Sequence, residues 1–332
     1  MANELIIIRK CPETLAELCD EVEALETPGL CLHRAARSDL NSRFSDLEGI
    51  PISIPPSYLA PFPGTGRREG VSSVASGKIY AGLGISIGRH KDWWEFNPST
   101  NTWTQKTDFP GTARNGAVAA AVLGKIYVGL GFTGSNQKDW YEYDPSNDTW
   151  AQKLDFAGEA RRYAVAAGAA GKIYFGFGYG TAYKNDWWEF DPVGNSWALK
   201  AGTFLPTRSS PVAAALSDKI YFGTGTSPAL KKDFYEYDPS GDSWTQKTDF
   251  AGSARKKAVI AAVNGKIYLG SGDDGSYKKD LWAFNPLNNT WAQSTDLRGL
   301  ARYGAIAASV NDKLFFGWGC NVTHPDDFWW HL

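Results

Sequence analysis

At 332 residues with a formal net charge of −2 at pH 7, the chain is long enough to bury a large core and has no charge excess that would attract nucleic acid. No stretch approaches the roughly 20 apolar residues of a membrane-spanning helix, and no secretory leader is visible. We therefore expect no membrane insertion and no nucleic-acid partner, and a location in the cytoplasm or in a leaderless assembly such as a virion.

The first 50 residues differ from the rest in charge and pattern, with 5 Lys and Arg against 10 Asp and Glu. Apolar residues follow a helical spacing over residues 12–26, and the pair Pro28-Gly29 ends that pattern. A second helical run covers residues 37–47. Residues 1–50 are predicted to form a small α/β extension, which either caps the remaining domain or attaches it to a larger assembly.

From Arg67 onward, one pattern returns every 47 residues, six times, without insertion or deletion. Each unit opens with an Arg, and the six are Arg67, Arg114, Arg161, Arg208, Arg255 and Arg302. Regular repetition of this length is typical of a radial or stacked array.

The unit that begins at Arg114 contains four predicted strands and no helical period. The strands are residues 116–122, 125–129, 139–144 and 149–153. The first is rich in alanine, as crowding around an axis requires, and the last two carry Trp and Tyr, which fill the gaps between diverging sheets. Each unit is therefore predicted to be one four-stranded antiparallel propeller blade.

The sixth unit runs from Arg302 to Leu332 and has room for only three strands. An open sheet edge is a liability that proteins avoid. Residues 61–67 match residues 108–114 in register, so residues 51–60 are predicted to supply the outer strand of the sixth blade. We expect an all-β domain over residues 51–332, a six-bladed propeller closed by its own N-terminal strand.

The unit resembles the kelch repeat. The resemblance lies in the Ile-Tyr pair of the second strand, such as Ile126-Tyr127, and in the Asp-x-aromatic-x-aromatic-Asp-Pro run that residues 186–192 show. The Gly-Gly pair of the family appears here as Gly-x-Gly, for example Gly82 and Gly84, so the local bend is expected to differ. The resemblance implies a binding scaffold, although a minority of such propellers, similar to galactose oxidase or sialic-acid mutarotase, are enzymes.

Strand order places the loops between second and third strands on the same face as the links between blades. This face gathers many Lys and Arg and fewer acids, and a basic face raises the local concentration of anionic partners. The opening arginines either bond carbonyls between blades or contact ligand. The candidate binding residues are Arg67, Arg68, Arg89, Lys91, Arg114, Lys138, Arg161, Arg162, Lys184, Arg208, Lys232, Arg255, Lys256, Lys279 and Arg302. Positions that differ between units, such as those directly after each opening Arg, favour a specific site.

Catalytic and metal-binding signals are weak, so we expect no enzyme activity, no metal and no cofactor. The four His do not cluster in sequence, and no nucleophile elbow, zinc-protease or phosphate-loop motif is present. A Glu recurs in the third strand of four units, as Glu95, Glu142, Glu189 and Glu236, and is expected to pair with Lys or Arg.

Three functions remain open. The first is a non-enzymatic module that presents its basic loop face to a protein or acidic ligand and is attached through residues 1–50. The second is a multivalent glycan- or receptor-binding module of a surface or virion appendage. The third is a sugar mutarotase-like enzyme, which requires one chemically distinct blade.

Overall fold

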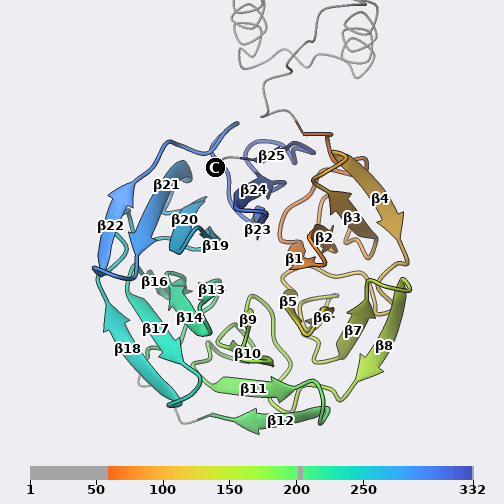
Figure 1. Cartoon of the computed structure of the whole chain (residues 1–332), viewed down its shortest axis with the longest axis horizontal. Coiled ribbons are helices and arrows are strands. Elements are labelled where there is room, and N and C mark those ends of the chain that lie inside the picture. The colour runs from red at the N-terminus through yellow and green to blue at the C-terminus, as the bar shows by residue number, and fades with distance from the viewer. Residues whose placement is uncertain (1–58, 201–204, 331–332) are drawn as a thin grey trace, which may run out of the picture. The chain divides into compact units, whose positions relative to one another are not determined.

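Every regular element in the described part of the computed structural model, residues 59–200 and 205–330, is a β-strand. Six sheets are arranged around a central axis, as Figure 1 shows, and this confirms the predicted six-bladed propeller. The chain divides into two units between Ser53 and Ile54, and all described residues belong to the second unit. The predicted extension over residues 1–50 lies outside the described residues.

Each described blade begins at the axis and proceeds outward in chain order. The innermost strands are β1 (Val71–Ala75), β5 (Val118–Val122), β9 (Val165–Ala169), β13 (Val212–Leu216), β19 (Val259–Val263) and β23 (Ile306–Val310). The second strands are β2 (Lys78–Gly82), β6 (Lys125–Gly129), β10 (Lys172–Gly176), β14 (Lys219–Gly223), β20 (Lys266–Asp273) and β24 (Lys313–Gly317).

The outer half of each blade contains the aromatic strands. The third strands are β3 (Trp93–Asn97), β7 (Trp140–Asp144), β11 (Trp187–Asp191), β17 (Phe234–Asp238), β21 (Tyr277–Asn285) and β25 (Phe328–Trp330). The fourth strands are β4 (Thr102–Lys106), β8 (Thr149–Lys153), β12 (Ser196–Leu199), β18 (Ser243–Lys247) and β22 (Thr290–Gln293). A short ribbon in the fourth blade pairs β15 (Thr226–Ser227) with β16 (Ala229–Leu230).

The two-residue turn between the first and second strands fixes the register of each blade. In the second blade this turn is Leu123-Gly124, with φ of 53° and 74°, the left-handed pair of a type I′ hairpin. The turn brings Val122 opposite Lys125 and continues the ladder to Val118 opposite Gly129. The repeated Lys-Ile-Tyr phrase, which is Lys-Leu-Phe in the sixth blade, therefore starts the second strand.

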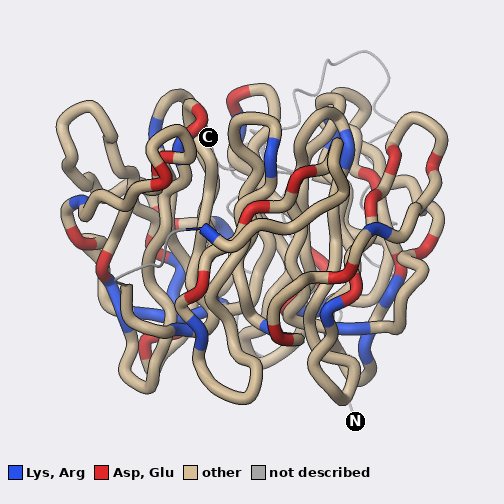
Figure 2. The backbone as a smooth tube through the Cα atoms, turned by 90° about the horizontal axis from the view of Figure 1, so that it is seen from below, with Lys and Arg blue, Asp and Glu red and all other residues tan. Residues whose placement is uncertain are grey.

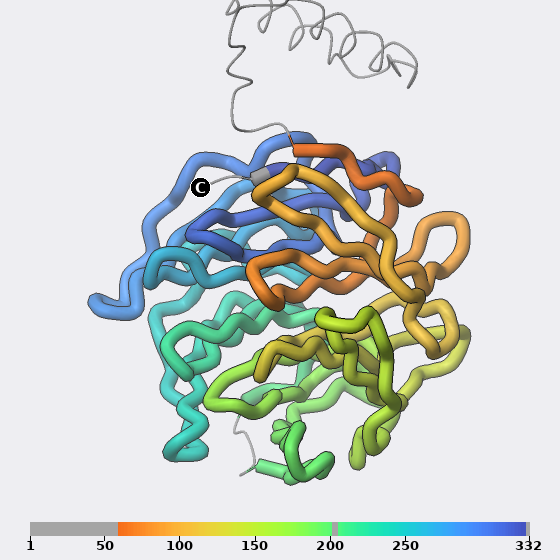
Figure 3. The backbone as a smooth tube through the Cα atoms, turned by 45° about the vertical axis from the view of Figure 1, so that its right-hand side comes forward, coloured from red at the N-terminus to blue at the C-terminus, as the bar shows by residue number. Residues whose placement is uncertain are grey.

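The innermost strands pack against one another in a closed circle. β1 contacts β5 on one side and β23 on the other, so the first and last blades lie side by side (Figure 3). The small residues predicted for this position allow the approach, because a strand next to the axis has little room. Ala120 and Ala167 are both buried there.

Aromatic rings fill the wedges between blades, as the sequence predicts. Trp93 on β3 meets Trp150 on β8 of the next blade with ring centroids 5.4 Å apart at 67°. Trp187 and Trp244 repeat this edge-to-face contact at 5.2 Å. Such pairs contribute about 0.5–1.5 kcal/mol beyond the area they bury. Much of the Trp content is thus explained by packing.

The segment that precedes the first blade closes the ring. The described sheet of the sixth blade has the three strands β23, β24 and β25, and most of the predicted fourth strand, residues 51–60, lies outside the described residues. The residues that follow it make the same contacts as their equivalents elsewhere. Trp103 Nε1 donates to the carbonyl of Ala60 at 3.0 Å, and the Phe62 amide donates to Asp326 at 2.9 Å.

Candidate functional site at the axial mouth

The six opening arginines lie in the interior, with at most 1 % of each residue exposed. Arg114 donates through Nη1 and Nη2 to the two carboxylate oxygens of Asp139, and Nη1 also donates to the carbonyl of Leu130 at 2.9 Å. The same bidentate pair forms in every blade. This geometry gives the opening arginines a structural role, because each guanidinium is buried and donates to partners within its own blade.

The Gly-x-Gly segment turns through two consecutive residues of positive φ. Leu130, the central residue, has φ of 57°, and Gly131 follows with φ of 93°. The carbonyl that Arg114 binds belongs to this left-handed leucine. The buried guanidinium therefore holds the turn that leads into each loop.

Six residues form a closed ring of backbone hydrogen bonds around the axis, and we call these the axial positions. The amide of Gly116 donates to the carbonyl of Glu69 at 3.0 Å, and the amide of Glu69 donates to Gly304 at 2.7 Å, which completes the circle. All six residues have φ between 52° and 61°. The axial positions are Glu69, Gly116, Tyr163, Ser210, Lys257 and Gly304.

Four of the axial positions carry a side chain in a conformation that favours glycine. Glycine occupies two of them, Gly116 and Gly304, at no steric cost. Non-glycine residues held at positive φ concentrate at functional sites, because their strain persists only where the surroundings impose it. The axial positions are therefore candidates for a functional site.

Side chains from three other blades converge on Glu69, and we call Glu69, Asn115, Tyr163 and Lys257 the axial cluster. Glu69 Oε2 accepts from Asn115 Nδ2 at 2.7 Å and from the Tyr163 hydroxyl at 2.8 Å. Glu69 Oε1 accepts from Lys257 Nζ. The Lys257 ammonium also lies 4.9 Å from the ring centroid of Tyr163 and 5.1 Å from that of Tyr303.

The axial cluster holds Glu69 ionised. Burial of the carboxyl opposes ionisation, but the Lys257 ammonium and hydrogen bonds from Lys257, Tyr163 and Asn115 outweigh it and lower the pKa of Glu69. Burial and the Glu69 charge raise the pKa of Tyr163. General acid–base groups work best with pKa values near the operating pH, and these two shifts move away from neutrality.

Residues at positions that vary between blades surround the axial cluster and form, together with the axial positions, the axial mouth. The residues directly after the opening arginines pair with the loops between second and third strands, and those loop residues pair with a further position. The flanking positions are Arg68, Asn115, Arg162, Ser209, Lys256 and Tyr303, and their loop partners are Ile85, Phe132, Tyr179, Thr226, Asp273 and Cys320. The outer loop positions are Arg89, Asn136, Tyr183, Leu230, Tyr277 and His324.

The axial mouth has an excess of positive charge. Arg68, Arg89, Arg162, Lys256 and Lys257 are opposed by Glu69 and Asp273, which leaves three positive charges uncompensated.

Histidine adds no charge to this excess. Arg68 Nη1 contacts His324 Nε2. Burial and the neighbouring Arg68 lower the pKa of His324, so this imidazole is neutral at pH 7 and accepts from the guanidinium.

The predicted lysines divide into exposed and paired ones. Exposed residues on the rim of the same face are Lys91, Lys138, Lys232 and Lys279. Lys184 pairs with Glu159, and Lys256 lies 3.6 Å from Asp273. Figure 2 shows more Lys and Arg toward one end of the ring and more Asp and Glu toward the other.

At the opposite end of the ring, several acids pair with lysines of their own blade or of the neighbouring blade. Asp144 pairs with Lys125, and Asp238 pairs with Lys219 at 2.7 Å. The recurring third-strand Glu is paired as predicted, since the carboxylate oxygens lie 2.6–3.3 Å from lysine Nζ atoms in the pairs Glu95–Lys78, Glu142–Lys153, Glu189–Lys200 and Glu236–Lys247.

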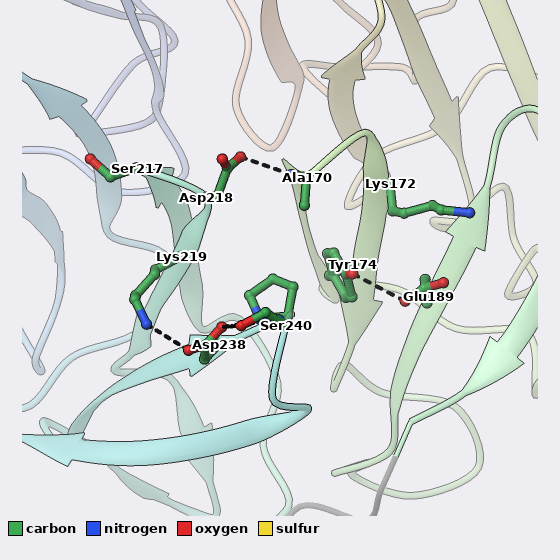
Figure 4. Close-up of a pocket in the computed structure, with 10 residues that line it drawn as sticks. Ala170, Lys172, Tyr174, Glu189, Ser217, Asp218, Lys219, Asp238 and Ser240 are labelled. Carbon is green, nitrogen blue, oxygen red and sulfur yellow. Dashed lines mark hydrogen bonds and ion pairs between the residues drawn. The ribbon is translucent and has the colours of Figure 1, made fainter.

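A pocket of about 400 Å³ lies at this opposite end between the third and fourth blades (Figure 4). Its polar lining is already satisfied: Tyr174 donates to Glu189 at 3.0 Å and Asp218 accepts from the Ala170 amide at 3.0 Å. The lysines that line it are also paired, Lys172 with Asp191 and Lys219 with Asp238. The axial mouth is the stronger candidate, because its charges are not balanced.

The site combines predicted and unpredicted residues. Sequence reasoning named Arg68, Arg89, Arg162 and Lys256, and the structure brings these four to the axial mouth. It did not single out Tyr163 or Phe132. One signal was available, because the second residue after each opening Arg is Gly in two units and bears a side chain in the other four.

Neither metal clustering nor a membrane-spanning helix is found over residues 59–200 and 205–330. No three His, Cys, Asp or Glu side chains of these residues come together in a way that could hold a metal ion. No helix long and apolar enough to cross a membrane is found there.

Comparison with known proteins supports the class defined by the fold, a six-bladed β-propeller. A solved structure described as "Structure of YjhT" matches with a TM-score of 0.70 over 82% of this chain and 95% of that chain, at 18% sequence identity. A likeness at this identity shows the fold alone. Neither a protein-family model nor a curated protein matches the chain.

Proposed function

We propose that this chain is a kelch-type propeller that acts as a non-enzymatic binding module and recognises an anionic ligand or acidic protein segment at the axial mouth. Residues 1–50 attach the module to a larger assembly in this proposal. The single observation that carries it is the excess of three positive charges at positions that vary between blades.

The arrangement of the axial mouth supports binding more than proton transfer. The pKa of Glu69 is lowered, so this carboxylate is a weak base at neutral pH. Lys257 neutralises the charge of Glu69. Arg68, Arg89 and Arg162 are therefore the cations that attract an anionic partner. A basic concave surface steers and retains anionic partners, and this attraction weakens as salt screens it.

The experiment is a titration of fluorescently labelled octaglutamate into wild type and two charge-reversal variants. Lys256→Glu changes the axial mouth, and Lys266→Glu places the same charge change on an exposed residue of the same blade at the opposite end. Lys256→Glu is expected to weaken binding about tenfold, since it replaces an attraction by a repulsion. Lys266→Glu should leave affinity within about twofold, because it lies beyond the Debye length of about 10 Å from the mouth.

Equal effects of the two reversals, or binding that does not weaken with added salt, would contradict the proposal. A comparison with and without residues 1–50 tests the attachment role separately. Octaglutamate affinity is expected to be the same in both, while capture by the larger assembly is expected only when residues 1–50 are present.

A further inference from the structure

Two arginines from different blades share one aromatic ring at the axial mouth. The guanidinium carbon of Arg89 lies 4.9 Å from the ring centroid of Phe132, and that of Arg162 lies 4.3 Å from it. The two charges are therefore separated by no more than the sum of these distances. Phe132 belongs to the second blade, whereas Arg89 and Arg162 come from the first and third.

The rings also limit where Arg162 can point. Its guanidinium carbon lies 5.5 Å from the ring centroid of Tyr179 and 5.8 Å from that of Tyr163. Stacking on aromatic faces orients a guanidinium and leaves its N–H groups available as donors. Arg89 is held in addition by its Nε, which donates to Asn115 Oδ1 at 3.0 Å.

Neither guanidinium forms an ion pair with a carboxylate in residues 59–200 or 205–330. Two acids of the first three blades are already engaged, Glu69 by Lys257 and Glu159 by Lys184. This contrasts with the six opening arginines, each of which has its own Asp. Arginine stays protonated at all working pH values, so two fixed positive charges without an ion-paired acid lie no farther apart than the sum of their distances to the Phe132 ring.

Only the junction of the first three blades provides this arrangement. The positions equivalent to Arg89 in the later blades are Asn136, Tyr183, Leu230, Tyr277 and His324, none of which is an arginine or lysine. The site is therefore single, although the scaffold repeats.

We propose that Arg89 and Arg162 bind one doubly charged tetrahedral oxyanion, the phosphate or sulfate group of a ligand. Two fixed charges are neutralised by a dianion and only half neutralised by a carboxylate. The guanidinium fork donates parallel N–H groups to two oxygens of one anion, and a tetrahedral group has enough oxygens to serve both forks. This inference rests on the proposed function and names the ligand group that the axial mouth selects.

The test is isothermal titration calorimetry of the full chain at constant ionic strength with sodium sulfate, with inorganic phosphate at pH 8 and with sodium acetate. Sulfate and phosphate are expected to bind, with acetate at least about tenfold weaker, because a charge-assisted hydrogen-bond pair is worth roughly that factor. Arg89→Gln and Arg162→Gln should each weaken sulfate binding about tenfold or more. Lys266→Gln, a change at an exposed lysine at the opposite end of the ring, should leave it unchanged.

Arg162→Lys provides a second variant, since it keeps the charge and removes the fork. It is expected to bind sulfate more weakly than wild type and more strongly than Arg162→Gln. Equal affinity for sulfate and acetate, or equal effects of Arg162→Gln and Lys266→Gln, would overturn the inference.

The two proposals fail separately. Octaglutamate binding that persists in a protein without sulfate affinity leaves the proposed function standing and removes the oxyanion site. Loss of both octaglutamate binding and sulfate binding contradicts the proposed function and the oxyanion site together. Phosphate binding without sulfate binding, or the reverse, still supports the site and identifies which group it takes.

Discussion

Lys257 of the fifth blade donates to Glu69 of the first blade, although a whole blade lies between them in the ring. The pair spans the axis, so it connects parts of the circle that share no strand contact. The Glu69 side chain is only 6% exposed and that of Lys257 22%. A charge pair at this position is shielded from solvent and couples the two halves of the propeller.

Removal of Lys257 should destabilise the propeller. Lys257→Met leaves the buried Glu69 carboxylate with only the more distant Arg68 Nε, 3.9 Å away, and loss of the closer partner of a buried pair costs about 3 kcal/mol in the free energy of unfolding. Urea denaturation measures the change. Lys256→Met is the matched control, because Lys256 is more exposed and 3.6 Å from its acid, so it should cost less than about 1 kcal/mol. A Lys257→Met protein as stable as Lys256→Met would contradict the role of the pair.

The same pair should make stability depend on pH in acid. The pKa of Glu69 is lowered in the folded state, so its ionised form adds stability above the unfolded value of about 4.3. That stability is lost as pH falls through the folded pKa. The difference in free energy of unfolding between wild type and Glu69→Gln should be constant from pH 7 to about 5 and then shrink below about 4. A difference that grows on acidification would contradict the shift.

The opening arginines should be essential to stability. Arg114→Met removes both hydrogen bonds to Asp139 and the one to the Leu130 carbonyl, and is expected to cost about 3–5 kcal/mol. Lys138→Met, one residue before Asp139, removes an exposed cation and should cost less than about 0.5 kcal/mol. Chemical denaturation of the two variants distinguishes a structural arginine from a ligand-binding one. Replacement of a ligand-binding arginine at the surface would lower the free energy of unfolding as little as Lys138→Met does.

The axial strain should be measurable where no contact offsets it. Ser210 has φ of 54° at an axial position that Gly116 occupies in the second blade. Ser210→Gly is expected to stabilise the protein by about 1 kcal/mol, since glycine adopts this conformation freely. Gly116→Ala should destabilise it, because the new Cβ would lie 2.7 Å from the ring of Tyr163. Thermal unfolding measures the change in stability of both variants. A Ser210→Gly protein less stable than wild type would contradict the proposed backbone strain at Ser210.

The propeller was predictable from the sequence because its signals are local and repeated. Lys125 and Gly129 bound a strand in both prediction and structure, since the Leu123-Gly124 turn fixes that strand's start. The charged face was also predictable, because strand order alone sorts the loops.

The axial cluster was not predictable from one unit at a time. Tyr163 is 94 residues and Lys257 is 188 residues from Glu69 along the chain, and only ring closure brings the three side chains together. From the sequence, we expected that a singular site would require one chemically distinct blade. In the structure, one distinct site is formed by side chains from several blades. Burial of the opening arginines was open for a different reason, since each pairs with an Asp 25 residues further along the same unit and the sequence does not show that the two side chains meet.

Ring closure predicts that Phe62 is as important as its equivalent in the next unit. Phe62 is fully buried and lies 4.6 Å from Trp318 of the sixth blade and 5.3 Å from Trp103 of the first, by ring centroids. Phe62→Ala should therefore cost about 3–5 kcal/mol, as expected for a buried Phe. Phe109→Ala is the matched control, because Phe109 is also fully buried and packs on Trp150 at 5.3 Å.

The comparison of these two variants tests closure directly. Equal losses by urea denaturation mean that the segment before the first blade is part of the folded ring. A Phe62→Ala loss below about 1 kcal/mol, beside a full loss for Phe109→Ala, would mean that the segment detaches at little cost. In that case the sixth blade would be held by β23 contacting β1 alone, and the axial hydrogen bond from Glu69 to Gly304 would have to hold the circle together.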